Sequence, residues 1–442
     1  MNWRDLCGPK LVTAERAVLN VQSGHIVNIA PYTTSPITLC NALMASGRER
    51  GLEGVQVEHL ASVVPWSANE FQGIFRLRDN YATPPNRAAC HAGDMDYLPI
   101  GLWKSHELPA GLSSRPDVFL VPVSPPDRHG YCSFGTGVWM SPTLVRGASM
   151  VIAEVREDFI HTFGENYVHV DQIDYFVEVE KQSAEAVPVA ELSEEEIAQV
   201  EAICTTVAVE LVNDGDTLQM GVGTVSASLA QFLDFRNDLG VQTELITGGV
   251  GELVKKGVVN GSRKTLHPNK VVGSAIVALN KEELDEIDNN PVFELYDFGY
   301  TDDLRRLITQ ENFVAVNNAM VVDLTGQVSA EAYDHRMYTG VGGQTVFMLA
   351  GAYSPGGKSV SVVPSSSVPS STGKRVSRIV PTLAPGTPVT VPRTYIDYVV
   401  TEFGIAELKG KTVIERANSL CDIAHPDYQD ELRASAKELY GA

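Results

Sequence analysis

The sequence lacks the marks of several protein classes. Its six cysteines are scattered without a C-x-x-C pair, which argues against a zinc ribbon and against a disulfide framework. Its longest apolar runs, such as 275–279 and 346–350, fall far short of the roughly 18 residues that a membrane helix requires. The first residues show no basic cap followed by an apolar stretch, and therefore no secretory signal. We expect a cytoplasmic protein with reduced thiols and no membrane partner.

Positive charge is also scarce. The 442 residues include 34 Lys and Arg against 55 Asp and Glu, a net charge of −21, so binding to nucleic acid or to anionic lipid is not expected. The ten histidines form no H-E-x-x-H or H-x-H arrangement, and no metal site is predicted. Walker and G-x-S-x-G sequences are missing, which leaves P-loop and serine-hydrolase chemistry without support. A hydrophobic fraction of 44% still indicates a folded, globular chain.

The order of apolar and amphipathic stretches predicts an α/β protein with mostly parallel sheets flanked by helices. Runs 118–123 and 150–155 are typical of buried strands. A polar, proline-broken segment at about 181–196 separates two such regions. We place a domain boundary in it, which gives an N-terminal α/β domain of residues 1–188 and a C-terminal α/β domain of residues 189–442.

Two stretches of the second half repeat stretches of the first. Residues 18–29 match residues 209–220, each with a glycine at a helix end and a strand after it. A second match joins the strand signal that ends in Glu58 to the one that ends in Glu244. The repeat predicts two domains of similar topology with a cleft between them. Ligands bind at the carboxyl ends of parallel strands, so both glutamates are candidate site residues; a solvated acid at a strand end is the plainer alternative.

Two glycine-rich turns are candidates for anion binding. The turn at 221–224 leaves a predicted strand and enters a helix, but it lacks the third glycine of a dinucleotide fingerprint, so no nicotinamide cofactor is predicted. The turn at 340–343 has three glycines in four residues, whose N–H groups suit an oxyanion hole or, equally, a plain tight turn. A Ser/Pro/Gly-rich and then basic segment, 364–378, is predicted to be a mobile loop that closes on an anionic ligand.

Seven motifs follow one another through the second half. They are L-Q-M-G-V-G (218–223), T-E-L (243–245), V-N-N-A-M-V-V-D (316–323), T-G-V-G-G-Q (339–344), S-R-I-V-P-T-L-A-P-G (377–386), V-T-E-F-G-I-A-E-L-K-G-K (400–411) and I-A-H-P-D-Y (423–428). The first half adds V-S-P-P-D-R-H-G-Y (123–131). The set resembles the class I CoA-transferases, and within them the 4-hydroxybutyrate CoA-transferase and acetyl-CoA hydrolase/transferase branch, over nearly the whole chain.

The resemblance implies a ping-pong reaction in which Glu244, which matches the family's nucleophile, attacks an acyl-CoA. A glutamate with a pKa of about 4.3 is already ionised at pH 7 and needs no general base. The reaction passes through an acyl-glutamyl anhydride to a glutamyl-CoA thioester, which a second carboxylic acid then reverses. Each tetrahedral intermediate needs N–H donors. The candidates are the amides of Val341, Gly342 and Gly343, with the side chain of Gln219 as a further donor.

The resemblance also implies which residues bind the substrates. The predicted CoA contacts are Gly221, Val222, Gly223, Thr224, Val225, Asn317, Gly340, Gly342 and Lys358. If the internal repeat holds, Glu58 faces Glu244 across the cleft, and Tyr32, Glu58 and Arg87 help to select the acyl group. CoA enters as a substrate thioester, so no cofactor is predicted. The partners are acyl-CoA and carboxylic acids, and the family implies a homodimer or a higher homo-oligomer.

Three rival functions stay open at this point. An acyl-CoA hydrolase would use the same Glu244 intermediate and pass it to water. A non-enzymatic CoA-binding regulator or a sugar-phosphate isomerase would share the fold. Charge distribution favours a CoA ligand, because residues 335–396 contain six Lys and Arg but no Asp or Glu. The sequence leaves the acyl donor and the acceptor acid undetermined.

Overall fold

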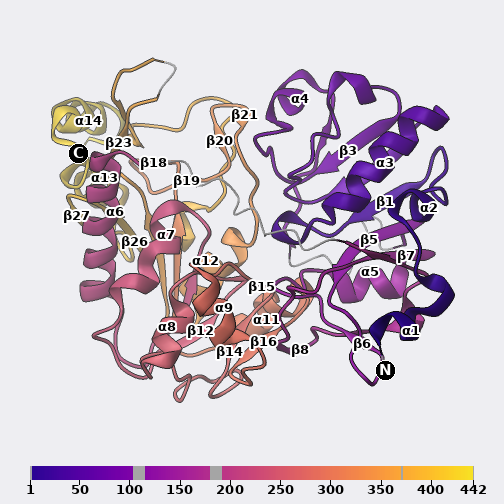
Figure 1. Cartoon of the computed structure of the whole chain (residues 1–442). Coiled ribbons are helices and arrows are strands. Elements are labelled where there is room, and N and C mark those ends of the chain that lie inside the picture. Colours follow the sequence, from indigo (N-terminus) through magenta and orange to yellow (C-terminus); the bar gives the residue numbers. More distant parts are fainter. Residues whose placement is uncertain (1, 103–114, 180–191, 370–371, 442) are drawn as a thin grey trace.

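The structure is a computed structural model, and it describes residues 2–102, 115–179, 192–369 and 372–441. Two halves of the chain, each built on one large sheet, lie side by side (Figure 1). The predicted boundary between residues 188 and 189 lies outside the described residues. None of the helices in the described ranges has both the length and the apolar character of a membrane span.

The N-terminal half contains a seven-stranded parallel sheet in the order β10-β7-β5-β1-β2-β3-β4. Its strands are β1 (Ile26–Ile29), β2 (Val55–His59), β3 (Phe75–Asp79), β4 (Asp96–Tyr97), β5 (Val118–Val123), β7 (Met150–Val155) and β10 (Tyr175–Glu178). Its helices are α1 (Trp3–Cys7), α2 (Ala14–Val18), α3 (Ile37–Arg50), α4 (Arg87–Ala92) and α5 (Ser141–Gly147). A short antiparallel pair, β6 (Tyr131–Cys132) and β9 (Val168–His169), lies outside the sheet.

The C-terminal half contains a nine-stranded sheet in the order β27-β26-β22-β17-β11-β12-β14-β16-β8, parallel except between β26 and β27. Its strands are β8 (Phe163–Gly164), β11 (Thr217–Met220), β12 (Gly240–Gln242), β14 (Val271–Gly273), β16 (Phe293–Leu295), β17 (Phe313–Asn318), β22 (Lys358–Val362), β26 (Tyr398–Thr401) and β27 (Gly404–Glu407). Its helices are α6 (Glu194–Thr206), α7 (Thr224–Ser228), α8 (Val250–Lys255), α9 (Lys281–Ile287), α10 (Phe298–Thr301), α11 (Leu304–Leu307), α12 (Gln344–Tyr353), α13 (Val413–Asp422) and α14 (Pro426–Tyr440).

Four small sheets surround this large one. They pair β13 (Leu245–Ile246) with β15 (Ala275–Ile276), β18 (Val321–Asp323) with β19 (Val328–Ser329) and β25 (Ile379–Val380), β20 (Ala332–Tyr333) with β21 (Arg336–Met337), and β23 (Ser366–Ser367) with β24 (Val376–Ser377).

The two large sheets share one topology. Reading each from the same edge, β10-β7-β5-β1-β2-β3-β4 corresponds strand for strand to β26-β22-β17-β11-β12-β14-β16. In both sheets, the strand of the repeated sequence is β1 or β11. On one side it pairs with β2, which contains Glu58, or with β12, which precedes Glu244; on the other side it pairs with a long buried strand, β5 or β17. The structure therefore confirms the predicted α/β class and the two domains of similar topology. The C-terminal sheet extends further, by β27 at one edge and by β8 at the other.

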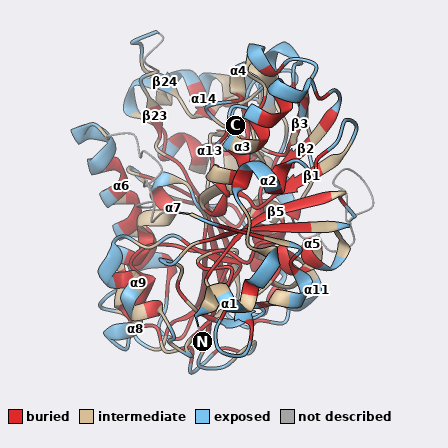
Figure 2. Cartoon of the chain, turned by 45° about the vertical axis from the view of Figure 1, so that its right-hand side comes forward, coloured by how far each residue is buried: buried red, intermediate tan, exposed pale blue. Residues whose placement is uncertain are grey.

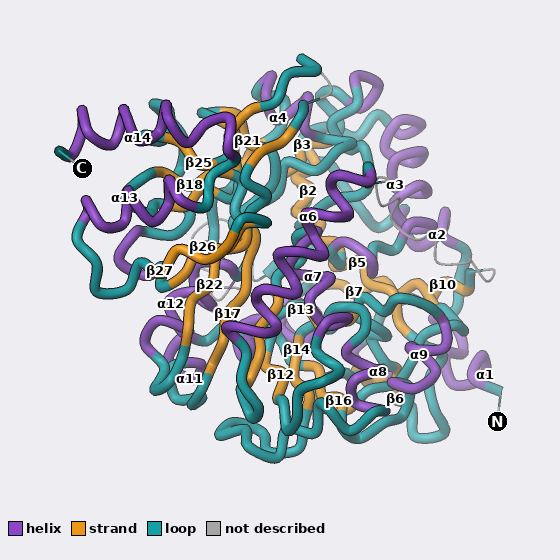
Figure 3. Tube along the Cα trace, turned by 90° about the vertical axis from the view of Figure 1, so that its left-hand side faces the viewer, coloured by secondary structure: helices purple, strands orange, loops and turns teal. Residues whose placement is uncertain are grey.

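Each sheet is buried on both faces, as its uninterrupted apolar strands predict. In β17, Val314 and Val316 pack into one core with α6 and α7, while Phe313 and Ala315 pack into a second core with α12. The alternation follows from the two-residue period of a strand. Figure 3 shows these helices on opposite sides of the strands, and Figure 2 shows buried residues along the strands and exposed residues on the outer helix faces.

Backbone hydrogen bonds join the two halves. The Val138 N–H donates to the Ser274 carbonyl (2.9 Å), and the Ile276 N–H donates to the Thr136 carbonyl (2.7 Å). The strand β8, which belongs to the N-terminal part of the chain, pairs with β16 of the C-terminal sheet. The halves are thus parts of one continuous structure rather than separable units.

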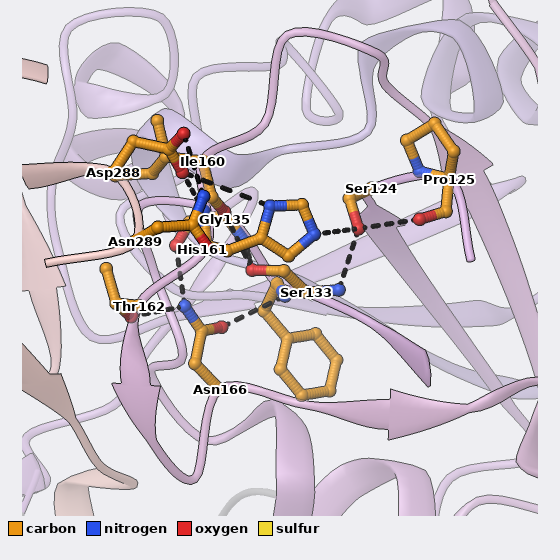
Figure 4. A network of polar contacts seen from close by, with 11 residues as sticks. Ser124, Pro125, Ser133, Gly135, Ile160, His161, Thr162, Asn166, Asp288 and Asn289 are labelled. Atoms are coloured by element: carbon orange, nitrogen blue, oxygen red, sulfur yellow. Dashed lines mark hydrogen bonds and ion pairs between the residues drawn. The ribbon is translucent and has the colours of Figure 1, made fainter. Parts of the chain in front are cut away.

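A polar network around His161 strengthens the same joint (Figure 4). The His161 N–H donates to the Asp288 carboxylate (2.7 Å), and the Asn289 N–H donates to the His161 carbonyl (2.8 Å). On the other side, the His161 ring contacts the Ser124 hydroxyl (3.4 Å). The network therefore connects the loop after β5 to the end of α9.

Candidate active site

Glu244 lies at a bend between β12 and β13, where the chain leaves the large sheet. Its carbonyl accepts the N–H groups of Ser274 (2.7 Å) and Ala275 (3.2 Å), which fix the bend. Its half-buried side chain reaches the 340–343 turn, where a Cβ on Gly343 would come within 2.3 Å of the Glu244 carboxylate. The Gly343 amide donates to this carboxylate. Only glycine leaves room for the contact.

The environment of Glu244 changes its acid strength. Burial raises the pKa of Glu244 to about 7, although the hydrogen bond from the Gly343 amide opposes the shift. The ordinary pKa assumed from sequence does not hold, because the folded chain removes water from the carboxylate. The carboxyl of Asp302 lies beside it, 2.6 Å from the same Cβ position on Gly343. The pKa of Asp302 is well above its usual range, because the side chain is fully buried and faces Glu244.

The N-terminal half closes over this turn. Asn80 and Tyr81 follow β3, and the Asn80 carbonyl would lie 2.0 Å from a Cβ on Gly340. The Tyr81 hydroxyl would lie 2.5 Å from a Cβ on Gly342, whose φ of +56° also favours glycine. Burial and then the charge of Glu244 raise the pKa of Tyr81. The phenol of one half thus lies near the predicted nucleophile of the other.

The first glycine-rich turn lies at the carboxyl ends of β11 and β17, as predicted. The Gly221 N–H donates to the Val316 carbonyl (2.9 Å), and a Cβ on Gly223 would come within 2.3 Å of the Asn318 side chain. Beside the turn, Gln219 and Asn317 exchange hydrogen bonds through their buried amides (2.7 and 3.2 Å). One N–H of Gln219 is therefore used by Asn317, and no contact places this side chain on Glu244 among the described residues.

The other predicted CoA contacts are divided between the surface and the core. Val222 and Thr224 are exposed at the turn, where a ligand has access. Val225 is 2% exposed and packs into the core beneath α7, so its side chain is structural. Lys358 begins β22 at the amino end, while Asn317 pairs with Ser361, three residues further along the strand. Its ammonium forms a partly buried ion pair with Asp216 (3.4 Å). A role for Lys358 in binding CoA therefore stays a prediction.

The predicted acyl pocket is only partly assembled. The Glu58 carboxylate is fully buried, accepts hydrogen bonds from Asn28 (3.2 Å) and Gln56 (2.9 Å), and pairs with Arg78 (3.4 Å). These partners belong to its own sheet, and the side chains that reach the Glu244 turn from this half are those after β3. A role for Glu58 in selecting the acid stays a prediction.

Tyr32 and Arg87 occupy different places. Tyr32 lies in a helical turn after β1, with a φ of +49°, and packs against the core shared by the two halves. Arg87 stacks on the Tyr338 ring (3.9 Å) and donates to the Tyr338 carbonyl (3.1 Å). Its guanidinium thus holds the strand pair before Gly340 against the N-terminal half, and a role for Arg87 in selecting the acyl group stays a prediction.

The basic segment, residues 364–378, is partly paired in the structure. Its described part forms the antiparallel pair β23–β24, and Arg375 pairs with Glu195 of α6 (2.6 Å). Together with the Lys358–Asp216 pair, this contact shows that acids from elsewhere in the chain neutralise part of the acid-free segment. Closure of this segment on an anionic ligand stays a prediction.

A serine, a histidine and an aspartate meet at the joint in Figure 4, but their geometry is structural. The Ser124 hydroxyl is buried, accepts the Ser133 N–H (2.8 Å) and donates to the Pro125 carbonyl (3.0 Å). The His161 ring lies 4.0 Å from the Asp288 carboxylate. A hydroxyl already engaged on both sides and closed off from solvent does not serve as a nucleophile.

Three residues of the site were not predicted from sequence: Asn80, Tyr81 and Asp302. The first two lie at the carboxyl end of β3, the strand next to the one that carries Glu58. The strand-end rule that identifies Glu244 applies to them too. Asp302 follows a four-residue helix and carries no local signal that separates it from its neighbour Asp303.

Comparison with known proteins places the chain among CoA-handling enzymes. The acetyl-CoA hydrolase/transferase N-terminal domain matches residues 4–189, and the C-terminal domain of the same name matches residues 280–436. The 4-hydroxybutyrate coenzyme A transferase of Clostridium kluyveri is 35% identical over 449 residues and covers 100% of both chains. The succinyl-CoA:acetate/propanoyl-CoA:succinate CoA transferase of Fasciola hepatica is 32% identical over 94% of this chain and 85% of its own. RipA from Yersinia pestis has a TM-score of 0.90 at 30% identity, with 100% of each chain covered.

Proposed function

The chain belongs to the acetyl-CoA hydrolase/transferase family and is an enzyme of the CoA-transferase type, and from that premise we propose that it moves CoA between two carboxylic acids through a thioester on Glu244. The observation that carries this proposal is the position of the Glu244 carboxylate, desolvated at a strand end and in contact with the Gly343 amide. The 340–343 turn lies where an oxyanion hole would be needed.

The proposed first half-reaction uses Glu244 as the nucleophile. A carboxylate oxygen attacks the thioester carbonyl and expels the CoA thiolate, which leaves an acyl-glutamyl anhydride. The thiolate then attacks the glutamyl carbonyl of the anhydride, and the first acid departs as its carboxylate. The product is a glutamyl-CoA thioester, and no net proton is gained or lost.

The second half-reaction runs the same steps backwards with a new acid. Its carboxylate attacks the glutamyl thioester, the thiolate leaves and then attacks the acyl carbonyl of the new anhydride, and Glu244 is released as a carboxylate. Each tetrahedral intermediate carries an oxyanion. The amides of Gly342 and Gly343, at the start of the ten-residue helix α12, are suited to stabilise it.

The raised pKa of Glu244 gives the proposal a pH dependence. Attack requires the ionised carboxylate, and a pKa of about 7 means that ionisation is incomplete at neutral pH. The rate of the first half-reaction therefore rises as the pH passes upward through 7. A desolvated carboxylate of higher basicity is also a stronger nucleophile than an ordinary glutamate once it is ionised.

The substrates are proposed by class. The exposed part of the 221–224 turn and the Asn317 amide are suited to bind CoA, because both lie at strand ends beside the Glu244 bend. The two relatives are named for transfer that involves 4-hydroxybutyrate, succinate and acetate. We therefore propose short-chain monocarboxylic or dicarboxylic acids as donor and acceptor, in a cytoplasmic homo-oligomer.

Hydrolysis is the second candidate, since water would release the same intermediate. The closure of Asn80 and Tyr81 over Gly340 and Gly342 favours transfer, because it restricts access of solvent to Glu244.

Isotope exchange tests transfer against hydrolysis. The enzyme is incubated with acetyl-CoA and isotopically labelled acetate, and the label in the thioester is measured against the free CoA released. We expect label in acetyl-CoA at a rate far above hydrolysis. Free CoA without exchange would favour the hydrolase, and neither product with acetyl-CoA or succinyl-CoA pairs would overturn the proposal.

A further inference from the structure

Asp302 is buried beside the nucleophile with one oxygen unused. Its side chain is 0% exposed. Its Oδ1 accepts a hydrogen bond from the Thr301 hydroxyl (2.8 Å), whereas its Oδ2 has no hydrogen-bond partner among the described residues. A buried carboxylate oxygen without a donor is costly, so this atom needs an explanation.

The unused oxygen lies close to the Glu244 carboxylate. The Asp302 Oδ2 and a Glu244 carboxylate oxygen both lie within 2.6 Å of one point, the Cβ position of Gly343. The two oxygens are therefore at most 4.9 Å apart. Two buried carboxylates this close do not readily both ionise, because like charges repel strongly in a dry site. One proton is therefore retained by the pair.

The surroundings decide which residue holds the proton. Glu244 is half-buried and receives the Gly343 amide, a donor that stabilises its charged form. Asp302 is fully buried, and the further charge that acts on it is that of Asp297, another acid. The proton thus resides on Asp302, where it also supplies the hydrogen bond that Oδ2 otherwise lacks.

We propose that Asp302 is a positioning residue, an un-ionised carboxylic acid whose Oδ2–H donates to the Glu244 side chain and orients it for attack. This inference rests on the proposed role of Glu244. In the free enzyme the donor points at the carboxylate. In the glutamyl-CoA state it points at the glutamyl carbonyl, as a side-chain complement to the Gly343 amide. The proton stays on Asp302 throughout, so the atoms and charges of the transfer steps balance as given above.

Two other titratable groups, Asp297 and Tyr81, lie near the pair. Asp297, before α10, accepts hydrogen bonds from the Gly299 amide (2.8 Å) and the Thr143 hydroxyl (2.8 Å). Tyr81 reaches the pair from the N-terminal half, and its pKa is far above its ordinary value through burial. A loss of activity at high pH that belongs to Tyr81 would disappear in Tyr81→Phe and persist in Asp302→Asn.

The test compares two substitutions at one position over a range of pH. Asp302→Asn keeps a donor that cannot ionise, whereas Asp302→Ala removes the donor. We expect Asp302→Asn to retain acetate exchange close to the wild-type rate and to lose the alkaline fall in activity that deprotonation of Asp302 causes. We expect Asp302→Ala to lose about 10- to 100-fold in kcat, the effect of one hydrogen bond to a charged group, with little change in KM.

The neighbouring Asp303 provides a matched control. Its carboxylate caps α11 and pairs with the exposed Arg305. Asp303→Asn removes the same charge one residue away and is expected to leave the rate and the pH profile unchanged. An Asp302→Asn variant as slow as Asp302→Ala, or an Asp302→Ala variant with the wild-type rate and profile, would overturn the inference.

Infrared spectroscopy separates this inference from the proposed function. The difference spectrum between wild type and Asp302→Asn at neutral pH is expected to contain the carbonyl band of an un-ionised carboxylic acid. That band depends on the proton and not on turnover. If the band is present but the enzyme shows no exchange activity, Asp302 holds the proton and the proposed role of Glu244 is refuted. If the band is absent from an active enzyme, only the inference about Asp302 is refuted.

Discussion

Two glutamates at matching places in the two halves have opposite environments. Glu58 lies inside the regular strand β2, where register sets it level with Asn28 and Arg78, and both neighbours bind its carboxylate. Glu244 lies beyond β12, which ends two residues earlier, and its carboxylate meets the Gly343 amide and the acid Asp302. One topology thus holds an ion-paired carboxylate in one half and, in the other, a carboxylate of raised pKa beside a second acid.

The difference shows where the fold creates reactivity. A glutamate that continues the ladder has cross-strand partners on both sides, and its charge is satisfied. A glutamate at a bend loses those partners and faces whatever the next layer provides. Here that layer is a turn of glycines with N–H groups and no side chains in the way. Shortening one strand by a few residues is sufficient to change an internal ion pair into a candidate nucleophile.

The largest expected difference in activity comes from replacing each of the two glutamates in turn. Glu244→Gln is expected to lower CoA-transfer activity by at least about 10⁴-fold, because an amide does not replace a nucleophilic carboxylate. Glu58→Gln is expected to keep measurable activity with an altered preference among acids. Initial rates with acetate and with succinate as acceptors check both. Equal losses from the two substitutions would erase the distinction.

The next largest effect is expected at the contact between the two halves. A Cβ at Gly340 would lie 2.0 Å from the Asn80 carbonyl, a backbone atom that cannot turn aside. Gly340→Ala is therefore expected to displace Asn80 and Tyr81 from the turn and to lower kcat/KM by about 100-fold.

Gly93→Ala is the matched control for Gly340→Ala. It replaces a left-handed glycine at the end of α4 that has open space around its Cβ position. This variant is expected to lose about 1 kcal/mol of stability and no activity. Wild-type activity in Gly340→Ala would show that closure of the N-terminal half is not needed.

Stability measurements also separate the two glutamates. Glu244→Gln and Glu58→Gln are expected to shift the free energy of unfolding in opposite directions. The folded-state pKa of Glu244, about 7, exceeds the unfolded value, so its burial disfavours the fold as the pH rises through 7. Glu244→Gln is expected to raise the free energy of unfolding at pH 8 by up to about 3 kcal/mol and to change it little at pH 5. Glu58→Gln is expected to lower it by about 1–3 kcal/mol at pH 8, since Arg78 loses its partner. Urea titrations at both pH values decide the signs.

The smallest effect is expected at the opposite ends of the strands. Lys358 pairs with Asp216 at the amino end of β22, so Lys358→Met is expected to change KM for acyl-CoA by less than about threefold, the weak effect of a distant charge. Asn317→Ala, at the carboxyl end of β17, is expected to raise KM clearly more. A larger KM change from Lys358→Met would place the CoA phosphates at the amino ends of the strands.

Much of the fold was predictable because it follows from local patterns. The apolar runs that form β5 and β7 were predicted to the residue, and the internal repeat predicted two domains of similar topology. Glu244 and the Gly340 turn came from motif resemblance. The contacts of Asn80, Tyr81 and Asp302 with that turn were not predictable, because they depend on how the halves dock. Nor did sequence reveal that Lys358 begins its strand at the end remote from Asn317 or that Arg87 stacks on Tyr338.

Mapping of the covalent intermediate tests the central claim most directly. The enzyme is incubated with acetyl-CoA or succinyl-CoA without an acceptor, trapped with borohydride or hydroxylamine, and digested for mass spectrometry. The account predicts a modified peptide that contains Glu244 and an unmodified peptide that contains Glu58. Modification of the Glu58 peptide, or an unmodified Glu244 peptide during active exchange, would contradict it.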